Sequence, residues 1–275
     1  MKLRQIGAAF TGVLLAASLV ACGGSGQSQS SGNASSGSGS SGDKTYTIAT
    51  DTTFAPFEFA DESGAQVGID IELLDAIAKD QGFDYKIDAV GFDMALQSVQ
   101  SGQADGVIAG MSITDDRKKV FDFSEPYYDA TVCAAVKSDS DIKSLEDLKG
   151  KDVAVKTGTM SADWAESVKD QYGFNVKSQF EKSDLMYSDV LAGNSAACFE
   201  DTPVMGYAIK KGMNLKVISE TEKSSKFAAP YGFAVNKGAN AELLKKFNDG
   251  LANIKKDGTY EKILNKYIQT EGAQQ

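Results

Sequence analysis

The chain of 275 residues contains no histidine. Histidine is the commonest side-chain metal ligand, the usual general base near neutral pH and a member of the serine-hydrolase triad. Its absence argues against catalysis of these kinds. We therefore expect a protein that is not an enzyme and that has no catalytic residue, metal or cofactor.

Cysteine is scarce, with three residues in the whole chain. Cys133 and Cys198 lie in separate apolar, strand-like runs, so no CxxC pair is present to hold a metal. Buried free thiols are the simpler interpretation, and a disulfide between them remains open because the chain carries an export signal, described next.

Long apolar runs are also missing, apart from one near the N-terminus. Lys2 and Arg4 precede an uncharged, mostly apolar stretch that ends at Leu19-Val20-Ala21-Cys22. This stretch is too short to span a bilayer and has the plan of an export signal, residues 1–21. The tetrapeptide resembles a lipobox, which predicts that Cys22 receives lipid; two acyl chains can anchor a protein stably where one cannot.

Charged residues are absent from residues 23–42, which contain only Gly, Ser, Gln, Asn and Ala. Such a composition cannot bury enough apolar surface to fold. We expect residues 22–44 to form a lipidated, disordered tether, with an average reach of about 25 Å for roughly 20 flexible residues.

The net charge of the whole chain is −10, and it would become −12 without Lys2 and Arg4. Nucleic acid or an anionic lipid surface would repel such a chain, so neither is an expected partner. The chain also has no Walker motif and no predicted transmembrane helix, so it cannot drive transport by itself.

From Thr45 onward strand-like and helix-like segments alternate, which predicts mostly parallel α/β sheets with helices on both faces. Two sets of this plan, without an evident sequence repeat, suggest two lobes. Asp70 is expected to cap the first helix and Gly82 to end it. Strands are predicted at 46–50, 83–89, 106–109, 132–136, 153–156, 176–180, 196–199 and 215–218, and helices at 94–101, 145–148, 162–172, 186–191, 204–210, 242–256 and 260–268.

The run from Ala109 to Tyr128, AGMSITDDRKKVFDFSEPYY, sets Arg117 just after a turn of small residues. A guanidinium can bind a carboxylate through two parallel hydrogen bonds, and the main-chain N–H groups of Gly110, Met111 and Ser112 can reach the same oxygens. Taken alone, a charged run of this kind is more often a solvated surface.

This run resembles the signature of the amino-acid-binding proteins that feed ABC importers, solute-binding protein family 3. The resemblance covers residues 45–268, is nearest to the glutamine-binding branch, and extends to residues 51–59 (DTTFAPFEF), 68–73 (GIDIEL), 122–128 (DFSEPYY), 155–159 (VKTGT) and 200–203 (EDTP). It implies a two-lobed fold like that of type II periplasmic binding proteins, with a two-strand hinge near residues 128–131 and 228–231. Lobe 1 would comprise residues 45–128 and 231–275, and lobe 2 residues 129–230.

The resemblance also implies a site for a free amino acid between the lobes. Arg117 would hold the α-carboxylate, helped by residues Ala109 to Ser112 and by Thr159. Asp201 would accept the α-ammonium, although an acid before Thr202 and Pro203 is also typical of a helix N-terminus. Phe54 and Phe92 would pack on either side of the ligand's carbon chain, although each alone would more often belong to a core.

Four further residues are expected to select the side chain: Asp51, Lys156, Met160 and Glu200. Glu200 and Met160 depart from the glutamine-binding branch, which has histidine and glycine there. An ionised glutamate only accepts hydrogen bonds, so Glu200 suits an amide NH₂ or a cation, and with Asp51 nearby it should repel an acidic ligand. The ligand therefore stays open among glutamine, other polar amino acids, and arginine or lysine.

We expect a monomeric receptor, anchored by lipid on Cys22 to the outer face of the cell membrane, that passes a polar amino acid to an ABC permease with its ATPase. Two alternatives are open. The family also resembles cyclohexadienyl dehydratases, in which case Glu200 would be the acid or base. The second alternative is a signalling receptor. Such a receptor would need a partner protein to pass on the signal, because the chain shows no output domain.

Overall fold

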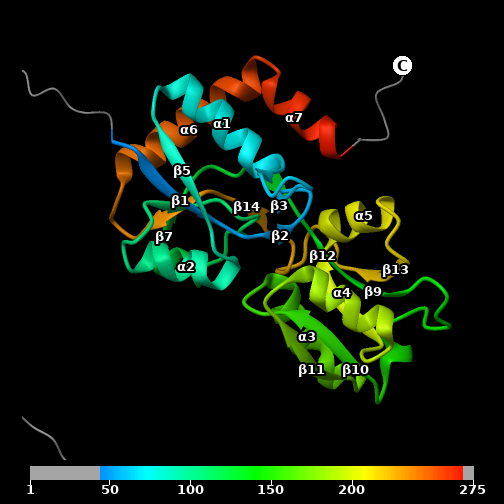
Figure 1. Ribbon diagram of the computed structural model, residues 1–275. Coiled ribbons are helices and arrows are strands. Elements are labelled where there is room, and N and C mark those ends of the chain that lie inside the picture. Colours follow the sequence, from blue (N-terminus) through cyan, green and yellow to red (C-terminus); the bar gives the residue numbers. More distant parts are fainter. Residues whose placement is uncertain (1–43, 269–275) are drawn as a thin grey trace, which may run out of the picture. The chain divides into compact units, whose positions relative to one another are not determined.

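Two five-stranded sheets, built from different stretches of chain, organise the computed structural model, which describes residues 44–268 (Figure 1). The predicted signal segment, Cys22 and nearly all of the predicted tether lie outside the described residues. All described residues belong to one compact unit, and its apolar cores include no residue before Tyr46. We therefore expect the chain from Asp43 onward to fold without the N-terminal segment.

The first sheet has the strand order β5-β1-β6-β15-β7. Strand β1 pairs in parallel with β5 and β6, whereas β15 runs antiparallel to both β6 and β7. The bounds are β1 (Tyr46–Thr50), β5 (Tyr85–Ala89), β6 (Gly106–Val107), β7 (Phe121–Phe123) and β15 (Ala234–Asn236).

Helices cover both faces of this sheet because its strands alternate their side chains between two cores. Ile48 of β1 belongs to one core and its neighbour Ala49 to the other. Helices α1 (Ile69–Gln81) and α6 (Ala241–Lys256) pack together on one face, and α2 (Phe92–Gln100) lies on the opposite face (Figure 1).

Helix α1 ends as predicted but does not begin as predicted. Gly82 takes the left-handed conformation and its N–H donates to the carbonyl oxygen of Ala78. Asp70 does not cap the helix: Gly68 holds that position, and the Asp70 side chain is fully buried inside the first turn. The prediction was wrong because a buried side chain of lobe 1 was taken for a solvated cap.

The second sheet has the order β11-β10-β12-β9-β13. Strands β10, β11 and β12 are parallel, and β9 is antiparallel to both of its neighbours. Helix α3 covers one face, and α4 and α5 contribute to the core of the other. The bounds are β9 (Val132–Lys137), β10 (Asp152–Lys156), β11 (Asn175–Phe180), β12 (Ala197–Asp201), β13 (Leu215–Glu220), α3 (Met160–Tyr172), α4 (Ser183–Ala192) and α5 (Thr202–Lys210).

Two short strands connect the sheets, as the expected two-strand hinge requires. β8 (Tyr128–Asp129) leads from β7 to β9, β14 (Pro230–Tyr231) leads back from β13 to β15, and the two pair antiparallel. Each five-stranded sheet thus has four strands in one direction and one reversed strand. The reversed strands are β9 and β15, and each is the first strand after the chain passes through the hinge. The α/β fold with two lobes, mostly parallel sheets and a two-strand hinge is confirmed.

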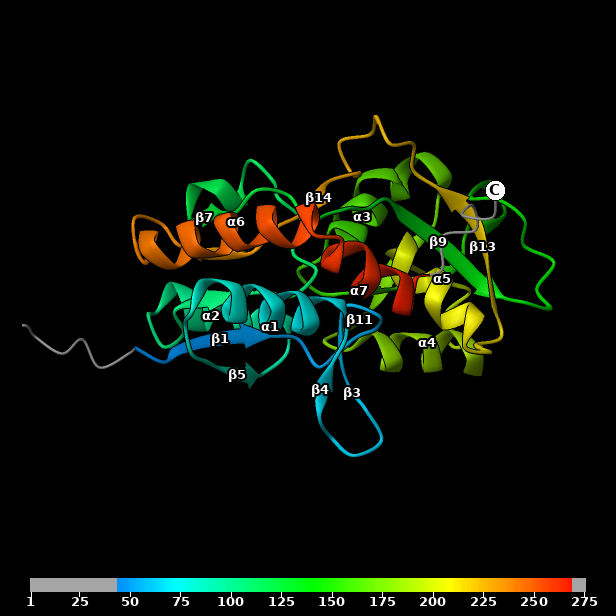
Figure 2. The same cartoon turned by 90° about the horizontal axis from the view of Figure 1, so that it is seen from above.

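The remaining elements surround these sheets. A three-stranded sheet of β2, β3 and β4 follows β1, and α7 at the end of the described chain packs on α1 and α6 (Figure 2). The predicted short helix at 145–148 is a 3-10 turn. The bounds are β2 (Thr53–Phe54), β3 (Glu58–Ala60), β4 (Gln66–Val67), α7 (Thr259–Tyr267), and the 3-10 turns Arg117–Lys119 and Glu146–Leu148.

Cys133 of β9 and Cys198 of β12 lie on neighbouring strands, and both are buried and free. They are not directly opposite each other: Cys198 pairs with Ala135, and Cys133 with Glu200. The disulfide left open by the sequence is therefore not formed here. None of the helices within residues 44–268 is long and apolar enough to cross a membrane.

Gly68 offers a test of this packing. Its φ is +130°, and a Cβ there would lie 2.2 Å from the carbonyl oxygen of Phe57. We expect Gly68→Ala to lower the free energy of unfolding of the chain from Asp43 onward by more than about 2 kcal/mol, measured by urea denaturation.

Gly206 in α5 provides the matched control, because nothing lies within 4 Å of its added Cβ and its φ is not positive. Gly206→Ala should stabilise the protein by about 0.5–1 kcal/mol. Equal effects of the two substitutions would contradict the packing described for Gly68.

Candidate functional site

A small cavity lies between residues of the two lobes, close to the carboxyl ends of β1 and β10. Its volume is ≈ 10 Å³, which is room for about one water molecule. Ten of the thirteen predicted ligand-binding residues line it. They are Phe54, Phe92, Ala109, Gly110, Ser112, Arg117, Lys156, Thr159, Met160 and Asp201.

The other three predicted residues, Asp51, Met111 and Glu200, are fully buried and do not line the cavity. Asp51 and Glu200 act on it through lining residues. Asp51 contacts the ammonium of Lys156, and Glu200 accepts a hydrogen bond from the backbone N–H of Asp201, 3.0 Å away.

Arg117 reaches the cavity from a 3-10 turn in lobe 1 and contacts lobe 2. Its two terminal nitrogens donate to the carbonyl oxygens of Ser112, at 2.8 Å, and Gly158, at 2.9 Å. The guanidinium carbon lies 5.3 Å from the centre of the Phe92 ring. Burial lowers the Arg117 pKa, and Asp201 partly opposes this. Since a guanidinium has five N–H donors and Arg117 has no ion pair within residues 44–268, it retains capacity for an anion.

The N-terminus of α3 adds a second feature that suits an anion. Thr159 caps this helix, its hydroxyl accepting from the N–H of Ala162 at 3.2 Å, and Met160 is the first helical residue. Both residues line the cavity. The first N–H groups of a helix and its dipole favour a negative charge at this end.

Gly110 differs from its expected role. Its N–H donates to Oδ2 of Asp70 at 2.8 Å, so it is not free to bind a ligand carboxylate. Its φ is +52°, and a Cβ would lie 2.4 Å from the Phe54 ring, so the cavity wall needs glycine here. The buried acid of α1 takes this N–H in this structure, and the donor role of Gly110 toward a ligand stays a prediction.

Asp201 ends β12 and directly precedes α5, but its side chain makes no helix-capping hydrogen bond. Oδ2 accepts from the hydroxyl of Tyr231 in the hinge, whereas Oδ1 is buried without a hydrogen-bond partner in the described part of the chain. Burial, with the nearby charge of Glu200, raises the Asp201 pKa to about 7. A cation placed at Oδ1 would satisfy this oxygen and favour the ionised carboxylate.

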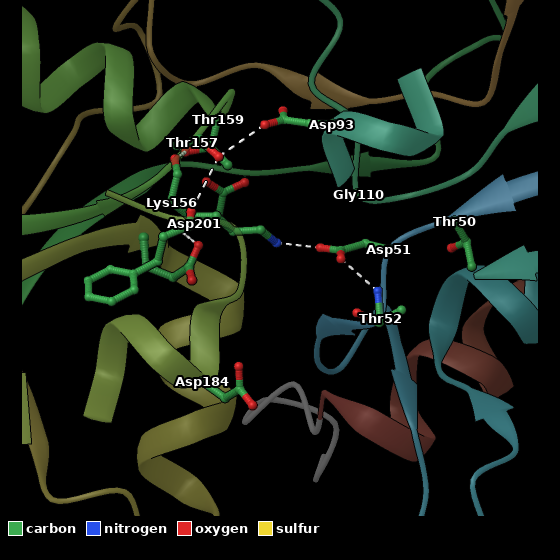
Figure 3. A network of polar contacts seen from close by, with 12 residues as sticks. Thr50, Asp51, Thr52, Asp93, Gly110, Lys156, Thr157, Thr159, Asp184 and Asp201 are labelled. Atoms are coloured by element: carbon green, nitrogen blue, oxygen red, sulfur yellow. Dashed lines mark hydrogen bonds and ion pairs between the residues drawn. The ribbon is translucent and has the colours of Figure 1, made fainter. Parts of the chain in front are cut away.

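Lys156 and Asp51 form a buried ion pair between the lobes, with both side chains only 1% exposed (Figure 3). The Lys156 ammonium lies 4.7 Å from the centre of the Phe54 ring and 5.9 Å from that of Phe92. Burial alone would lower the Lys156 pKa, but the carboxylates of Asp51 and Glu200 outweigh it and the pKa is raised. Lys156 therefore stays charged beside the two aromatic rings.

Glu200 is held by protein donors on both oxygens. Oε1 accepts from the N–H of Asp201, and Oε2 accepts from the hydroxyl of Tyr187 in α4 at 2.8 Å. In this closed geometry Glu200 contributes charge near Lys156 and Asp201 rather than a surface of the cavity.

Sequence reasoning missed several residues that complete the site. Tyr231 and Tyr187 position the carboxylates of Asp201 and Glu200, and Asp93 of α2 accepts from the hydroxyl of Thr157 at 3.0 Å across the cleft (Figure 3). Only Tyr231 had a usable signal, because it falls at the predicted second crossing. Residues 44–268 contain no group of three or more acidic, cysteine or histidine side chains placed to hold a metal ion.

Comparisons with known proteins agree with this architecture. The arginine-binding extracellular protein ArtP of Bacillus subtilis is 33% identical over 92% of this chain and 94% of its own length. The second substrate binding domain of a putative amino acid ABC transporter from Streptococcus pneumoniae is 49% identical over 81% of this chain and 99% of that chain, with a TM-score of 0.58.

Reconstructed ancestral proteins also match. An ancestral arginine-binding protein, solved bound to glutamine, is 40% identical over 82% of this chain and 98% of that chain, with a TM-score of 0.74. The same protein type bound to arginine gives 42% identity over the same shares and the same TM-score. An ancestral amino acid-binding protein described as a precursor of cyclohexadienyl dehydratase is 36% identical over 82% of this chain and 96% of that chain, with a TM-score of 0.73.

A family model described as bacterial extracellular solute-binding proteins, family 3, matches residues 46–270. That match includes both sheets, the hinge and every residue of the cavity. The chain belongs to family 3 of the bacterial extracellular solute-binding proteins.

Proposed function

We propose that this protein is a receptor that captures a polar amino acid, glutamine in the first place, and delivers it to an ABC importer. The observation that carries the proposal is the pairing of opposite charges around one cavity. Arg117 and the α3 N-terminus suit an α-carboxylate, and the unpartnered Oδ1 of Asp201 suits an α-ammonium.

Capture requires the lobes to open, because a cavity of ≈ 10 Å³ cannot admit an amino acid. Arg117 comes from lobe 1, whereas Thr159 and Asp201 come from lobe 2. A ligand that contacts all three favours closure by its differential affinity for the closed state. The permease can then distinguish the loaded receptor from the empty one.

The ion pair between Asp51 and Lys156 favours glutamine among the possible ligands. Lys156 lines the cavity and Asp51 contacts it, so a ligand that enters between the lobes would meet a donor and an acceptor, which are complementary to the carbonyl and NH₂ of a primary amide. Arginine or lysine could bind Asp51 and Glu200 instead, but each would bring a second cation beside Lys156. One ancestral arginine-binding protein is solved bound to arginine and one is solved bound to glutamine, which supports a basic amino acid as the alternative ligand.

We place the receptor on the extracytoplasmic face of the membrane. The signal segment (1–21) and the tether after Cys22 (22–44) support export and lipid anchoring, and relatives are named as extracellular or periplasmic. Lobe 1 would comprise residues 45–128 and 231–275, and lobe 2 residues 129–230. The working unit would be a monomer with a permease and its ATPase as partners.

An enzyme of the cyclohexadienyl dehydratase type is the second candidate, because one structural relative is a described precursor of such an enzyme. Glu200 would be its acid or base. Both Glu200 oxygens accept hydrogen bonds from protein groups and neither lines the cavity, which favours binding without catalysis. Turnover of prephenate or arogenate by the purified protein would overturn this choice.

The carboxylate clamp is tested by Arg117→Ala in the chain from Asp43 onward. A buried, charged hydrogen bond contributes about 1.5–3 kcal/mol, so we expect glutamine to bind at least about tenfold more weakly by calorimetry. Lys118→Ala, which removes an exposed neighbouring charge, should leave affinity unchanged. An Arg117→Ala affinity within a factor of about two of wild type would show that Arg117 is not the clamp.

Asp201 should make binding depend on pH. Its carboxyl has a pKa of about 7 without ligand and must be ionised to accept the ammonium. Affinity should therefore fall as pH decreases through about 7, approaching tenfold per unit well below it. Asp201→Asn should bind weakly with a flatter profile, and the exposed control Asp184→Asn should behave as wild type. Equal wild-type affinities at pH of about 5.5 and about 8 would refute this role.

Ligand identity is tested by calorimetry against all twenty amino acids and cystine. We expect tight binding of glutamine or a basic amino acid and negligible binding of glutamate, because Asp51 and Glu200 repel a third carboxylate. Glu200→His should change the order of affinities among glutamine, arginine and lysine. An unchanged order would remove Glu200 from the determinants of specificity.

A further inference from the structure

Two buried carboxyl groups of lobe 1, Glu58 and Asp70, do not line the cavity and have no part in the proposed contacts with ligand. Both side chains are fully buried. Glu58 begins β3, and Asp70 lies in the first turn of α1, where its backbone N–H donates to the carbonyl oxygen of Phe57 at 2.9 Å. The fold therefore forces the two carboxyl groups together.

Their hydrogen bonds are unequal. Oδ2 of Asp70 accepts from the N–H of Gly110 and from the hydroxyl of Tyr127, both at 2.8 Å. Oδ1 of Asp70 and both oxygens of Glu58 have no N–H or hydroxyl partner in the described part of the chain. Glu58 and Asp70 thus bring three unpartnered carboxyl oxygens into one buried region, and the charge of Asp70 acts to raise the pKa of Glu58.

Two ionised carboxylates in this buried region would repel each other and leave three buried oxygens unsatisfied. One proton removes both problems. A neutral Glu58 would have a hydroxyl to donate to the unpartnered Oδ1 of Asp70, while the ionised Asp70 would keep its two bonds through Oδ2.

The surrounding charges assign that proton to Glu58. Burial raises the pKa of both groups, to about 6 for Asp70 and well above the usual range for Glu58. Donors from Gly110 and Tyr127 oppose the rise at Asp70. The charges of Asp70 and Asp51 add to the rise at Glu58, and Lys156 of lobe 2 opposes it.

We propose that Glu58 and Asp70 share a single proton near neutral pH, and that this acid–carboxylate pair positions the cavity wall at Gly110 and the start of the hinge at Tyr127. Gly110 lines the cavity and has its N–H fixed by Asp70. Tyr127 directly precedes β8, and its backbone N–H donates to the carbonyl oxygen of Tyr231 at 2.9 Å.

Tyr231 in turn holds Asp201, so the pair supports two sides of the site without touching ligand. Glu58 and Asp70 are thus positioning residues. Their effect on affinity rests on the proposed function, whereas the sharing of a proton does not.

The proton is tested directly by infrared spectroscopy of the ligand-free chain from Asp43 onward at a pH of about 7.5. The spectrum of wild type minus that of Glu58→Gln should show the C=O stretch of a protonated, buried carboxylic acid. If the difference shows only carboxylate bands, Glu58 is ionised and the proposal is overturned. This result does not depend on which ligand the protein binds, or on whether it binds one.

The positioning role is tested by comparing Glu58→Gln with Glu58→Ala in calorimetry with glutamine. In Glu58→Gln the amide NH₂ of the substituted side chain can replace the acid as donor to Asp70, so this variant should bind the ligand glutamine within about twofold of wild type. Glu58→Ala removes the donor and should bind at least about tenfold more weakly. Wild-type affinity in a folded Glu58→Ala, or equal losses in both variants, would overturn the positioning role.

Thermal unfolding across pH provides the readout should Glu58→Ala fail to fold. A carboxyl whose pKa is raised by folding stabilises the native state less as pH rises toward that pKa. The melting temperature of wild type relative to Glu58→Gln should therefore fall as pH rises from about 5 to about 10. A relative melting temperature that rises across this range would contradict a proton held by Glu58.

Discussion

The buried ion pair between Asp51 and Lys156 is the interaction on which the closed cleft depends. It joins the end of β1 in lobe 1 to the end of β10 in lobe 2, away from water. Two ions leave water at a cost of several kcal/mol each, and their attraction offsets this only while they stay together. Opening the lobes separates the ions but returns both to solvent, so the closed and open states are closer in free energy than the short contact alone suggests.

The contacts that Arg117 and Asp201 make in this structure are also weak enough to be replaced by contacts with a ligand. Arg117 now donates to two carbonyl oxygens, from Ser112 and Gly158, which are weaker partners than a carboxylate. Asp201 has one oxygen without a partner. Arg117 thus has only neutral acceptors and Asp201 has an unsatisfied oxygen, and the zwitterion that we propose as ligand would complement both without a change in net charge.

Much of the architecture follows from local sequence pattern. The strand Tyr46–Thr50 and the end of α1 at Gly82 have the predicted positions because alternation and a left-handed glycine are local signals. Ten predicted residues also meet at one cavity, but that prediction came from resemblance to a family rather than from periodicity.

The local sequence pattern could not predict the hydrogen bonds between residues that are far apart in the sequence. Asp70 resembles a helix cap when only its neighbours are considered, yet it bonds to Gly110 and Tyr127, which are 40 and 57 residues away. The bond from Tyr231 to Asp201 likewise spans 30 residues. The Asp70 contacts depend on how lobe 1 packs, and the Asp201 contact depends on how the chain returns through the hinge, and no local propensity records either.

The reversed strand in each sheet has a mechanical consequence. β9 lies between β12 and β13, and β15 lies between β6 and β7, so each strand that leaves the hinge is hydrogen-bonded on both sides. Strand β8 is thus joined to β9 by residues 130–131 alone, and β14 is joined to β15 by residues 232–233 alone. Each hinge strand is therefore tied by a two-residue link to an interior strand of a sheet. A rotation of one lobe against the other would therefore bend the chain at these few peptide units and in the longer links 124–127 and 221–229.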